Sequence, residues 1–280
     1  MKTVNEMQLK ALVKNKAAEL GITPQAALQV YCLERLLERI SMSDKKDCFI
    51  IKGGFLISAM IGVEYRSTMD IDATVKGFDV NEDNVSEIFK NICDIQIADQ
   101  LNFIFDRVEY IRETDDYPGI RVFLKAQYEK MDTTLTVDVT TGDSIVPAEI
   151  QFEYRCVFDD KIIPMMAYTL ENVLAEKLET IISRGIANTR PRDFYDVYIL
   201  YSLKKNEIDY NILKQAIEST VGKRGSAEIM SNYKSILQTI GNNHAQNSYW
   251  KRYSSKNQFA NTIEFQSTVD SAMILLDRSL

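Results

Sequence analysis

The stretch that decides the fold is KGGFLISAMIGVEYRSTMDID, residues 52–72. It opens with Lys52, Gly53 and Gly54, directly after a short apolar strand candidate at residues 48–51. Glycine between a strand and a helix lets backbone N–H groups approach a phosphate closely, and the helix N-terminus adds a favourable partial charge. The opening therefore predicts a phosphate-binding turn, followed by a helix over residues 55–61.

The same stretch ends with two aspartates separated by one apolar residue, Asp70 and Asp72 around Ile71. We expect a strand over residues 65–75, and residues two apart on a strand point to the same face of a sheet. Two adjacent carboxylates repel each other unless a cation lies between them. Hard oxygen ligands suit Mg²⁺, which commonly binds one or two carboxylates together with substrate phosphates. The pair therefore predicts a metal site.

A third acid occurs in TLTVDVT, residues 134–140. Alternation along this predicted strand places Leu135, Val137 and Val139 on one face and Asp138 on the other. An isolated acid of this kind is as often a solvated residue on a one-sided sheet. If its strand lies beside that of Asp70 and Asp72, however, Asp138 completes a two-metal site of the kind used in phosphoryl transfer.

A lysine interrupts the apolar face of a helix predicted over residues 170–184. Helical periodicity places Lys177 among the apolar positions of that face. Its charge must either extend to the solvent or meet an anion, and a phosphate is one such anion. From the residues alone, both interpretations stay open.

The next predicted helix opens with RPRDFYD, residues 190–196. Asp193 could favour the helix N-terminus, and Asp196 could be a surface acid. Arg190 and Arg192 beside an acid at a turn could equally form a phosphate clamp.

Composition excludes several classes of protein. The chain has 280 residues, is 45% hydrophobic and 26% charged, and contains only 11 glycines and 5 prolines, so it is globular rather than fibrous or disordered. Its one histidine, His244, excludes His-rich metal sites. The four cysteines form no CxxC pair, which excludes a zinc ribbon and a dithiol redox motif and indicates ordinary thiols of a reducing compartment.

Charge and hydropathy bear on partners and location. Residues 1–160 contain 18 basic and 28 acidic residues, whereas residues 161–280 contain 15 and 12. This imbalance permits a polyanionic partner on the second part only, although two ordinary solvated surfaces would give it too. The longest apolar-rich stretch, residues 53–62, is far shorter than the ~20 residues of a membrane span. We therefore expect a cytoplasmic protein without a membrane partner.

The pattern along the chain predicts an α+β fold: a mixed sheet with flanking helices, then a helical C-terminal portion. A helix is expected to begin at Thr23 and Pro24. The predicted domains are residues 1–165, with N-terminal helices, and residues 166–280, which complete the active site. The other predicted helices cover residues 82–95, 192–203 and 208–220, and the other predicted strands cover residues 102–111, 120–128, 133–139 and 152–158.

Four motifs in order make the chain resemble the AbiEii/AbiGii toxin family, nucleotidyltransferase-like proteins of bacterial abortive-infection and toxin–antitoxin systems. The resemblance covers residues 31–205 and implies a core like that of DNA polymerase β. The motifs are KGGFL at 52–56, RSTMDID at 66–72, AEKL at 175–178 and RDFYDV at 192–197.

The resemblance assigns roles to individual residues. Asp70 and Asp72 match the metal-binding pair for Mg²⁺ or Mn²⁺, and Asp138 fits the third carboxylate. Asp193 matches a downstream catalytic acid, with Asp196 as the alternative. Lys177 matches a lysine that serves catalysis and contacts the nucleotide. The nucleotide-binding residues that the resemblance implies are Lys52, Gly53, Gly54, Arg66, Ser67, Lys177 and Arg192.

The chain departs from the wider superfamily in two ways. Phe55 replaces a serine that often follows the loop glycine there, and the gap to Asp70 is longer. A hydroxyl contact to phosphate would then be absent or come from Ser67 or Ser58.

The implied function is transfer of a nucleoside monophosphate from an NTP to an acceptor hydroxyl. The expected acceptor is the 3′ end of tRNA, so that translation stops, in a type IV-like toxin–antitoxin or phage-defence setting with a separate antitoxin. Two alternatives stay open: a regulatory protein that binds NTP without turnover, and an enzyme that nucleotidylates proteins.

Overall fold

In a computed structural model, the chain is described over residues 5–66, 68–112 and 119–280. It divides into two compact units, and each is considered by itself. The first holds residues 1–143 and 150–167, and the second holds residues 144–149 and 168–280. The two domains that the sequence places on either side of residue 165 stay a prediction.

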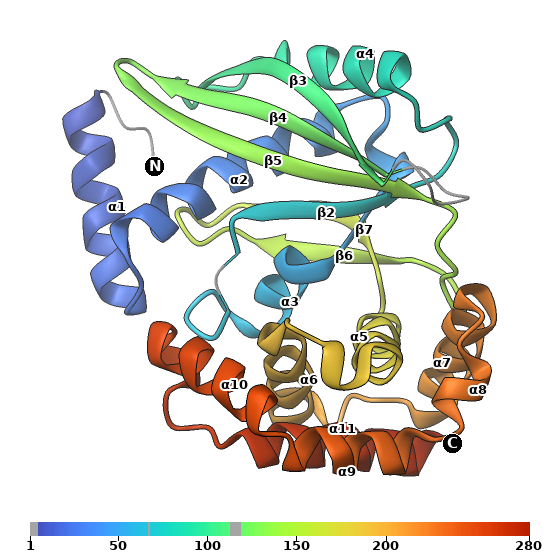
Figure 1. Cartoon of the computed structure of the whole chain (residues 1–280). Helices are drawn as coiled ribbons and strands as arrows, with labels where there is room; N and C mark the ends of the chain where they lie inside the picture. The colour runs from blue at the N-terminus through green and yellow to red at the C-terminus, as the bar shows by residue number, and fades with distance from the viewer. Residues whose placement is uncertain (1–4, 67, 113–118) are drawn as a thin grey trace. The chain divides into compact units, whose positions relative to one another are not determined.

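A seven-stranded mixed sheet dominates the first unit (Figure 1). Its strands are β1 (Phe49–Lys52), β2 (Asp70–Val75), β3 (Asn102–Arg112), β4 (Gly119–Tyr128), β5 (Met131–Thr141), β6 (Ile150–Arg155) and β7 (Ile162–Ala167). Their order is β3-β4-β5-β2-β1-β7-β6. The pairs β1–β7 and β2–β5 are parallel, and the remaining neighbours are antiparallel. This arrangement confirms the predicted mixed sheet.

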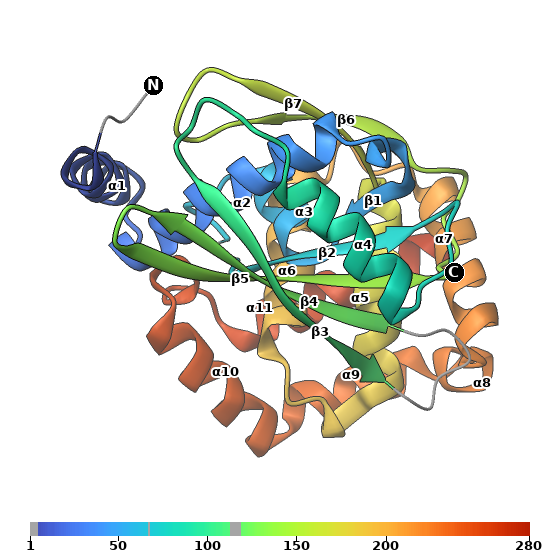
Figure 2. The ribbon, with the colours of Figure 1, turned by 90° about the horizontal axis from the view of Figure 1, so that it is seen from above.

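Helices flank the sheet. They are α1 (Glu6–Leu20), α2 (Pro24–Met42), α3 (Gly53–Ile61) and α4 (Glu82–Cys93), with a 3₁₀ turn η1 at Lys46–Cys48. The predicted start of α2 is confirmed, because the Thr23 hydroxyl accepts the Ala26 N–H at 3.1 Å and Pro24 is the first helical residue. Seen from above, α2 and α4 lie side by side over one face of the sheet (Figure 2).

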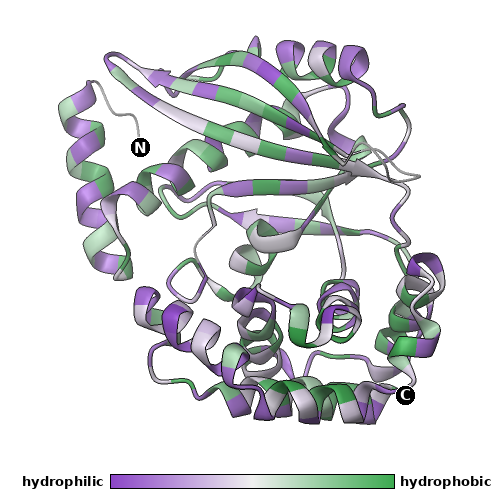
Figure 3. Cartoon of the chain, viewed as in Figure 1, coloured by the Kyte–Doolittle hydropathy of each residue, from purple (hydrophilic) through white to green (hydrophobic). Residues whose placement is uncertain are grey.

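Alternation along the central strands decides which residues line the core. On β5, Leu135, Val137 and Val139 are fully buried, whereas Thr136 and Asp138 between them are half-buried. Hydrophilic and hydrophobic residues alternate in the same way along β4 (Figure 3). The polar residues of these two strands therefore share one face of the sheet, opposite the core side chains.

Several predicted boundaries differ in detail from the structure, and one strand is missing from the prediction. The strand expected over residues 65–75 begins at Asp70, after a turn that contains Tyr65. Helix α3 begins at Gly53 rather than at residue 55, so both glycines belong to its first turn. Strand β7 was not predicted, because Pro164 within it cannot donate a ladder hydrogen bond and signals a strand end in the sequence.

The second unit is helical, as the sequence predicts. Its helices are α5 (Leu170–Arg184), α6 (Pro191–Lys204), α7 (Tyr210–Arg224), α8 (Ala227–Met230), α9 (Tyr233–Asn242), α10 (His244–Lys256) and α11 (Phe265–Ser279), with 3₁₀ turns η2 (Gly185–Ala187) and η3 (Gln258–Ala260). Phe194 of α6 packs edge-on against Phe265, with ring centroids 5.3 Å apart. Among the described residues of the whole chain, no helix has the length and apolar character that a membrane crossing requires.

Candidate active site

The turn between β1 and α3 requires glycine at its first position. Gly53 has φ of +64°, a conformation that L side chains rarely adopt. A Cβ there would lie 2.1 Å from Oδ2 of Asp72, so the backbone approaches that carboxylate as closely as it can. The Gly54 N–H donates to the same oxygen at 3.3 Å. The predicted phosphate-binding turn and the predicted acidic pair therefore lie together.

Asp70 and Asp72 occupy the first and third positions of β2, with Ile71 fully buried between them. Both aspartates are half-buried and lie on the same side of the strand. The Thr68 hydroxyl donates to Oδ1 of Asp70 at 2.9 Å and so orients it. The structure thus gives the pair the shared face that its spacing predicts.

One row of charged residues crosses four neighbouring strands at this place. Lys52 of β1 is opposite Asp72, Asp72 is opposite Asp138 of β5, and Asp138 is opposite Arg121 of β4. Because directly paired residues share a face, and neighbouring strands are about 4.8 Å apart, the two acids are neighbours flanked by two cations. We call these four residues the charged row. Asp138 is thereby beside the Asp70–Asp72 pair, as required of a third carboxylate.

Arg121 is a residue that sequence reasoning missed. Its Nε donates to Oδ1 of Asp138 and its Nη2 donates to Oδ2, both at 2.7 Å. These bonds, followed by the nearby charges of Asp138, Asp70 and Asp72, raise the pKa of the guanidinium, which is positive at any ordinary pH. The only signal in the sequence is a basic residue between two buried apolar ones, Ile120 and Val122, which is common on any one-sided strand.

Lys52 at the other end of the charged row is held by an acid outside the predicted set. Its ammonium forms an ion pair with Asp143, and the Thr140 hydroxyl donates to the same Asp143 oxygen at 3.1 Å. Lys52 also opposes the rise of the Asp72 pKa, so its charge acts on both acids. A phosphate that binds at this turn would therefore share the Lys52 ammonium with Asp143.

Burial, and then the charges of Asp70 and Asp138, raise the pKa of Asp72 to about 6 from an ordinary value of 3.8. The Lys52 charge and the Gly54 N–H oppose this rise without cancelling it. A cation bound beside Asp72 would therefore favour its charged form, which burial and the two neighbouring carboxylates disfavour.

The raised pKa predicts a pH dependence of stability for the protein without metal. Between about pH 4 and pH 6 the folded state retains a proton on Asp72 that the unfolded state has lost, so wild-type stability should fall as the pH rises through this range and then level off. Asp72→Asn lacks this proton exchange. Urea unfolding in EDTA should therefore show the variant gaining on wild type from pH 4 to pH 7.

The exposed Asp132 of β5 supplies the matched control for that measurement. Asp132→Asn should keep a constant difference from wild type over the same pH range. A difference between Asp72→Asn and wild type that does not change with pH would contradict a raised Asp72 pKa.

Arg66 lies against the second glycine of the turn. A Cβ on Gly54 would lie 3.1 Å from Nη2 of Arg66 and 3.0 Å from the Thr68 hydroxyl oxygen. Arg66 is buried, so the guanidinium is fixed near the N-terminus of α3. Ser67, the other predicted nucleotide-binding residue here, lies outside the described residues. Phe55 stacks on Tyr154 with ring centroids 5.2 Å apart, a packing role that a serine could not fill.

The remaining predicted site residues belong to the second unit. Lys177 of α5 lies 2.7 Å from Oδ1 of Asp193 and 2.7 Å from Oδ2 of Asp196, both on α6. Burial alone would lower the pKa of this ammonium, but the charges of Asp196 and then Asp193 raise it instead. Arg190 lies 3.7 Å from Asp193, whereas Arg192 is exposed.

This cluster corrects two expectations. Asp196 is fully buried, so it is not a surface acid, because its carboxylate faces Lys177 rather than the solvent. Lys177 meets its anion inside the protein, so an outward-directed lysine without a partner is excluded. Its contact with a nucleotide stays a prediction, as does the choice between Asp193 and Asp196, since the lysine touches both.

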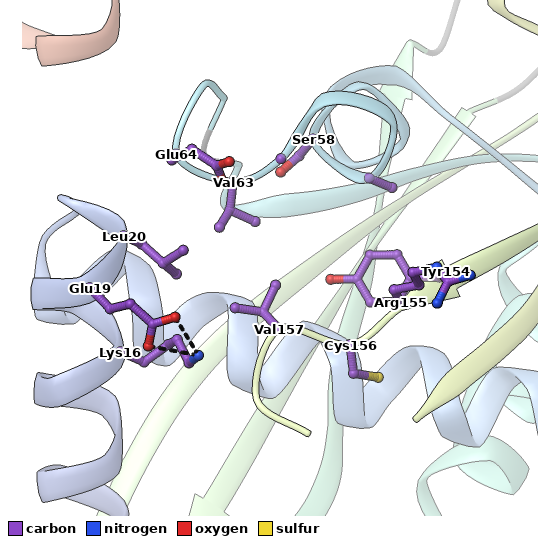
Figure 4. Close-up of a pocket in the computed structure, with 12 residues that line it drawn as sticks. Lys16, Glu19, Leu20, Ser58, Val63, Glu64, Tyr154, Arg155, Cys156 and Val157 are labelled. Carbon is purple, nitrogen blue, oxygen red and sulfur yellow. Dashed lines mark hydrogen bonds and ion pairs between the residues drawn. The ribbon is translucent and has the colours of Figure 1, made fainter. Parts of the chain in front are cut away.

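A separate cavity of about 260 Å³ lies in the first unit (Figure 4). Its walls come from the end of α1, the end of α3 with the turn that follows, and the end of β6. Ser58, one proposed source of a phosphate-contacting hydroxyl, lines this cavity and is buried. The cavity contains no other predicted or alternative site residue.

Residues 35–271 match the family model described as nucleotidyl transferase AbiEii toxin, type IV toxin–antitoxin system. Comparison with curated proteins gives no match.

Solved structures share the fold. A candidate nucleotidyltransferase from H. pylori is 13% identical with a TM-score of 0.55, covering 91% of this chain and 95% of that one. JHP933 from Helicobacter pylori is 13% identical with a TM-score of 0.53, covering 91% of each chain. MenT4, a nucleotidyltransferase toxin from Mycobacterium tuberculosis, is 14% identical with a TM-score of 0.51, covering 96% and 98%. At these identities the likeness confirms the predicted nucleotidyltransferase-like fold.

Proposed function

The chain belongs to the family of AbiEii nucleotidyl transferase toxins of type IV toxin–antitoxin systems, and from this premise we propose that it transfers NMP from an NTP to the 3′ end of tRNA. The observation that carries the proposal is the charged row, in which Asp72 and Asp138 are paired across β2 and β5 beside the N-terminus of α3. A phosphate-binding turn and a carboxylate cluster on one sheet face are the two parts that this chemistry needs.

The N-terminus of α3 would hold the triphosphate. Its first backbone N–H groups and the helix dipole favour an anion. The absence of a Cβ at Gly53 and Gly54 lets the side chains of Asp72, Thr68 and Arg66 lie directly against this turn. Lys52 directly precedes this turn, Arg66 lies against Gly54, and both add positive charge. Together these groups would bind and orient the nucleotide with its α-phosphorus toward the acids.

Asp70 and Asp72, joined by Asp138, would hold Mg²⁺ or Mn²⁺. The donor set fits in its chemistry, because all three groups are carboxylates and they come from the two paired strands β2 and β5. Burial, and then the charges of Asp70 and Asp138, raise the pKa of Asp72, and a bound cation would offset both. When bound, the metal supplies charge stabilisation for the phosphate oxygens. The acceptor oxygen forms a bond to the α-phosphorus, the bond from that phosphorus to the bridging oxygen breaks, and pyrophosphate leaves.

Asp138 would position the acceptor hydroxyl and take its proton, a task that nucleotide binding does not require. Asp138→Asn is therefore expected to retain NTP affinity and to lose transfer by ~10²-fold or more, the usual scale for a positioned base. Filter binding of labelled NTP and the transfer rate should be measured on the same preparation. Near-normal transfer would remove Asp138 from the mechanism.

The decisive experiment for the function incubates the protein with total tRNA and each labelled NTP in turn, in Mg²⁺ and in EDTA. Label at the 3′ end of RNA in one reaction, absent with Asp72→Asn, supports the proposal. Label that appears in protein would indicate a protein-nucleotidylating enzyme. Tight NTP binding with no label anywhere would indicate a regulatory protein.

The cellular consequence follows from the acceptor. A tRNA blocked at its 3′ end cannot be charged, so expression in the cytoplasm should stop translation, and a cognate antitoxin should relieve the arrest. We extend the proposal to defence against phage, in which arrest of the infected cell limits phage production. Growth arrest by wild type but not by Asp72→Asn tests the toxicity.

A further inference from the structure

Asp138 is fully engaged in the structure. Arg121 takes both of its carboxylate oxygens in the two-bond geometry that Arg and carboxylate form best. In keeping with this, no three His, Cys, Asp or Glu side chains among the described residues are arranged to hold a metal ion. The third carboxylate is therefore adjacent to the other two, yet its oxygens are directed to Arg121.

The two partners differ in how far solvent reaches them. The Arg121 side chain is 42% exposed, whereas that of Asp138 is 15% exposed. The Arg121 guanidinium is therefore more accessible to an anion in solution than the Asp138 carboxylate is to a cation. Phosphate is the other group that guanidinium binds with two parallel hydrogen bonds, so a phosphodiester can compete directly with Asp138.

The charges of the neighbourhood favour such an exchange. Asp70, Asp72 and Asp138 carry up to three negative charges, and Lys52 and Arg121 are the cations of the charged row that flank them. A bound cation would compete with Arg121 for the Asp138 carboxylate. A phosphate at Arg121 would remove that competitor and supply the guanidinium with a new anion at once.

We propose that Arg121 is a positioning residue that masks Asp138 until a phosphate of the acceptor RNA takes its guanidinium. The inference rests on the proposed function and deepens it. Acceptor binding then releases the third carboxylate toward Asp70 and Asp72, and the site is completed only when a hydroxyl is present to react. An NTP that binds before the acceptor therefore meets an incomplete site and is not hydrolysed by water.

Mn²⁺ binding without nucleotide tests the mask, because it needs no turnover. We expect Arg121→Gln to bind Mn²⁺ at least tenfold more tightly than wild type by electron paramagnetic resonance titration. Arg107→Gln is the matched control, since Arg107 is an exposed arginine of β3 that also pairs with carboxylates. It should leave Mn²⁺ affinity unchanged.

Loss of a positive charge could by itself raise affinity for a cation, and a double-mutant cycle separates the two causes. If Arg121 acts by holding Asp138, then Arg121→Gln should give no gain in the Asp138→Asn background. The proposal would be overturned if Arg121→Gln raised Mn²⁺ affinity equally in the Asp138→Asn background. It would also be overturned if Arg121→Gln did not raise Mn²⁺ affinity in the otherwise wild-type protein. Arg121→Lys, which keeps the charge but loses the two-bond geometry, should show an intermediate gain, and circular dichroism should show that each variant is folded.

The second arm tests the acceptor. A single-stranded RNA oligonucleotide ending in a 3′-deoxynucleotide should tighten Mn²⁺ binding to wild type and leave Arg121→Gln unaffected, whereas an equal effect on both proteins would overturn the proposal. The transfer assay with total tRNA distinguishes the failures. If tRNA is labelled but the effect of Arg121→Gln on Mn²⁺ affinity does not depend on Asp138, only the masking role of Arg121 is wrong. If that effect depends on Asp138 but no RNA is labelled, the proposed reaction is wrong and the masking of Asp138 by Arg121 stands.

Discussion

Asp72→Asn is expected to abolish nucleotidyl transfer and growth arrest while the protein stays folded. Replacing a residue that only hydrogen-bonds to a metal ligand typically lowers activity by about 10–100-fold. Loss of a carboxylate that binds the metal directly should therefore lower activity by ~10²-fold or more. Folding should not suffer, because the neutral amide can still accept the Gly54 N–H and no longer repels Asp70 and Asp138. Asp70→Asn should behave alike, since it removes the other half of the pair.

The measurement is incorporation of labelled NMP into RNA at saturating NTP, beside a thermal melt of each variant. Asp132→Asn is the control, because it removes an exposed carboxylate from the same sheet without touching the charged row. Wild-type rates for both Asp70→Asn and Asp72→Asn would show that the acidic pair is not the active site.

The central part of the site could be predicted because it depends on local geometry alone. The two-residue period of a strand is enough to give Asp70 and Asp72 a common face and to bury Ile71. The strand–glycine–helix order is equally local. It follows from the residue types at 53 and 54, where a side chain would meet Asp72, Thr68 and Arg66.

What could not be predicted depends on register between distant segments. Arg121 meets Asp138 only because β4 and β5 pair with the two residues directly opposite, a register set by a tight turn in which Glu129 has φ of +52°. A slip of one residue would place Arg121 on the core face. No pattern within either strand records this pairing.

The same holds for Lys177, whose partners lie 16 and 19 residues along the chain on the next helix. Periodicity correctly placed this lysine among the apolar residues of α5, but the packing of α5 against α6 decides what it meets there. On one of the two interpretations that the sequence leaves open, Lys177 has no buried partner, and such a lysine costs desolvation energy, so its removal would be harmless or stabilising. The structure reverses the sign of that expectation.

Lys177→Ala should destabilise the protein by about 3–5 kcal/mol, the usual cost of breaking a buried ion pair by removing one partner. The substitution leaves the buried carboxylates of Asp193 and Asp196 without the charge that they share. Urea unfolding at pH 7 measures this loss. Lys214→Ala is the control, because Lys214 of α7 forms an exposed pair with Glu218 that should contribute less than ~1 kcal/mol.

A compensating variant identifies the cause. If uncompensated negative charge is what destabilises Lys177→Ala, then adding Asp193→Asn and Asp196→Asn should restore part of the loss, since neutral amides carry no charge to bury. NTP affinity should be measured on the wild type, on Lys177→Ala and on the variant that combines all three substitutions. Unchanged stability of Lys177→Ala together with a large loss of NTP affinity would mean that the nucleotide, and not the pair of aspartates, is the anion that this lysine serves.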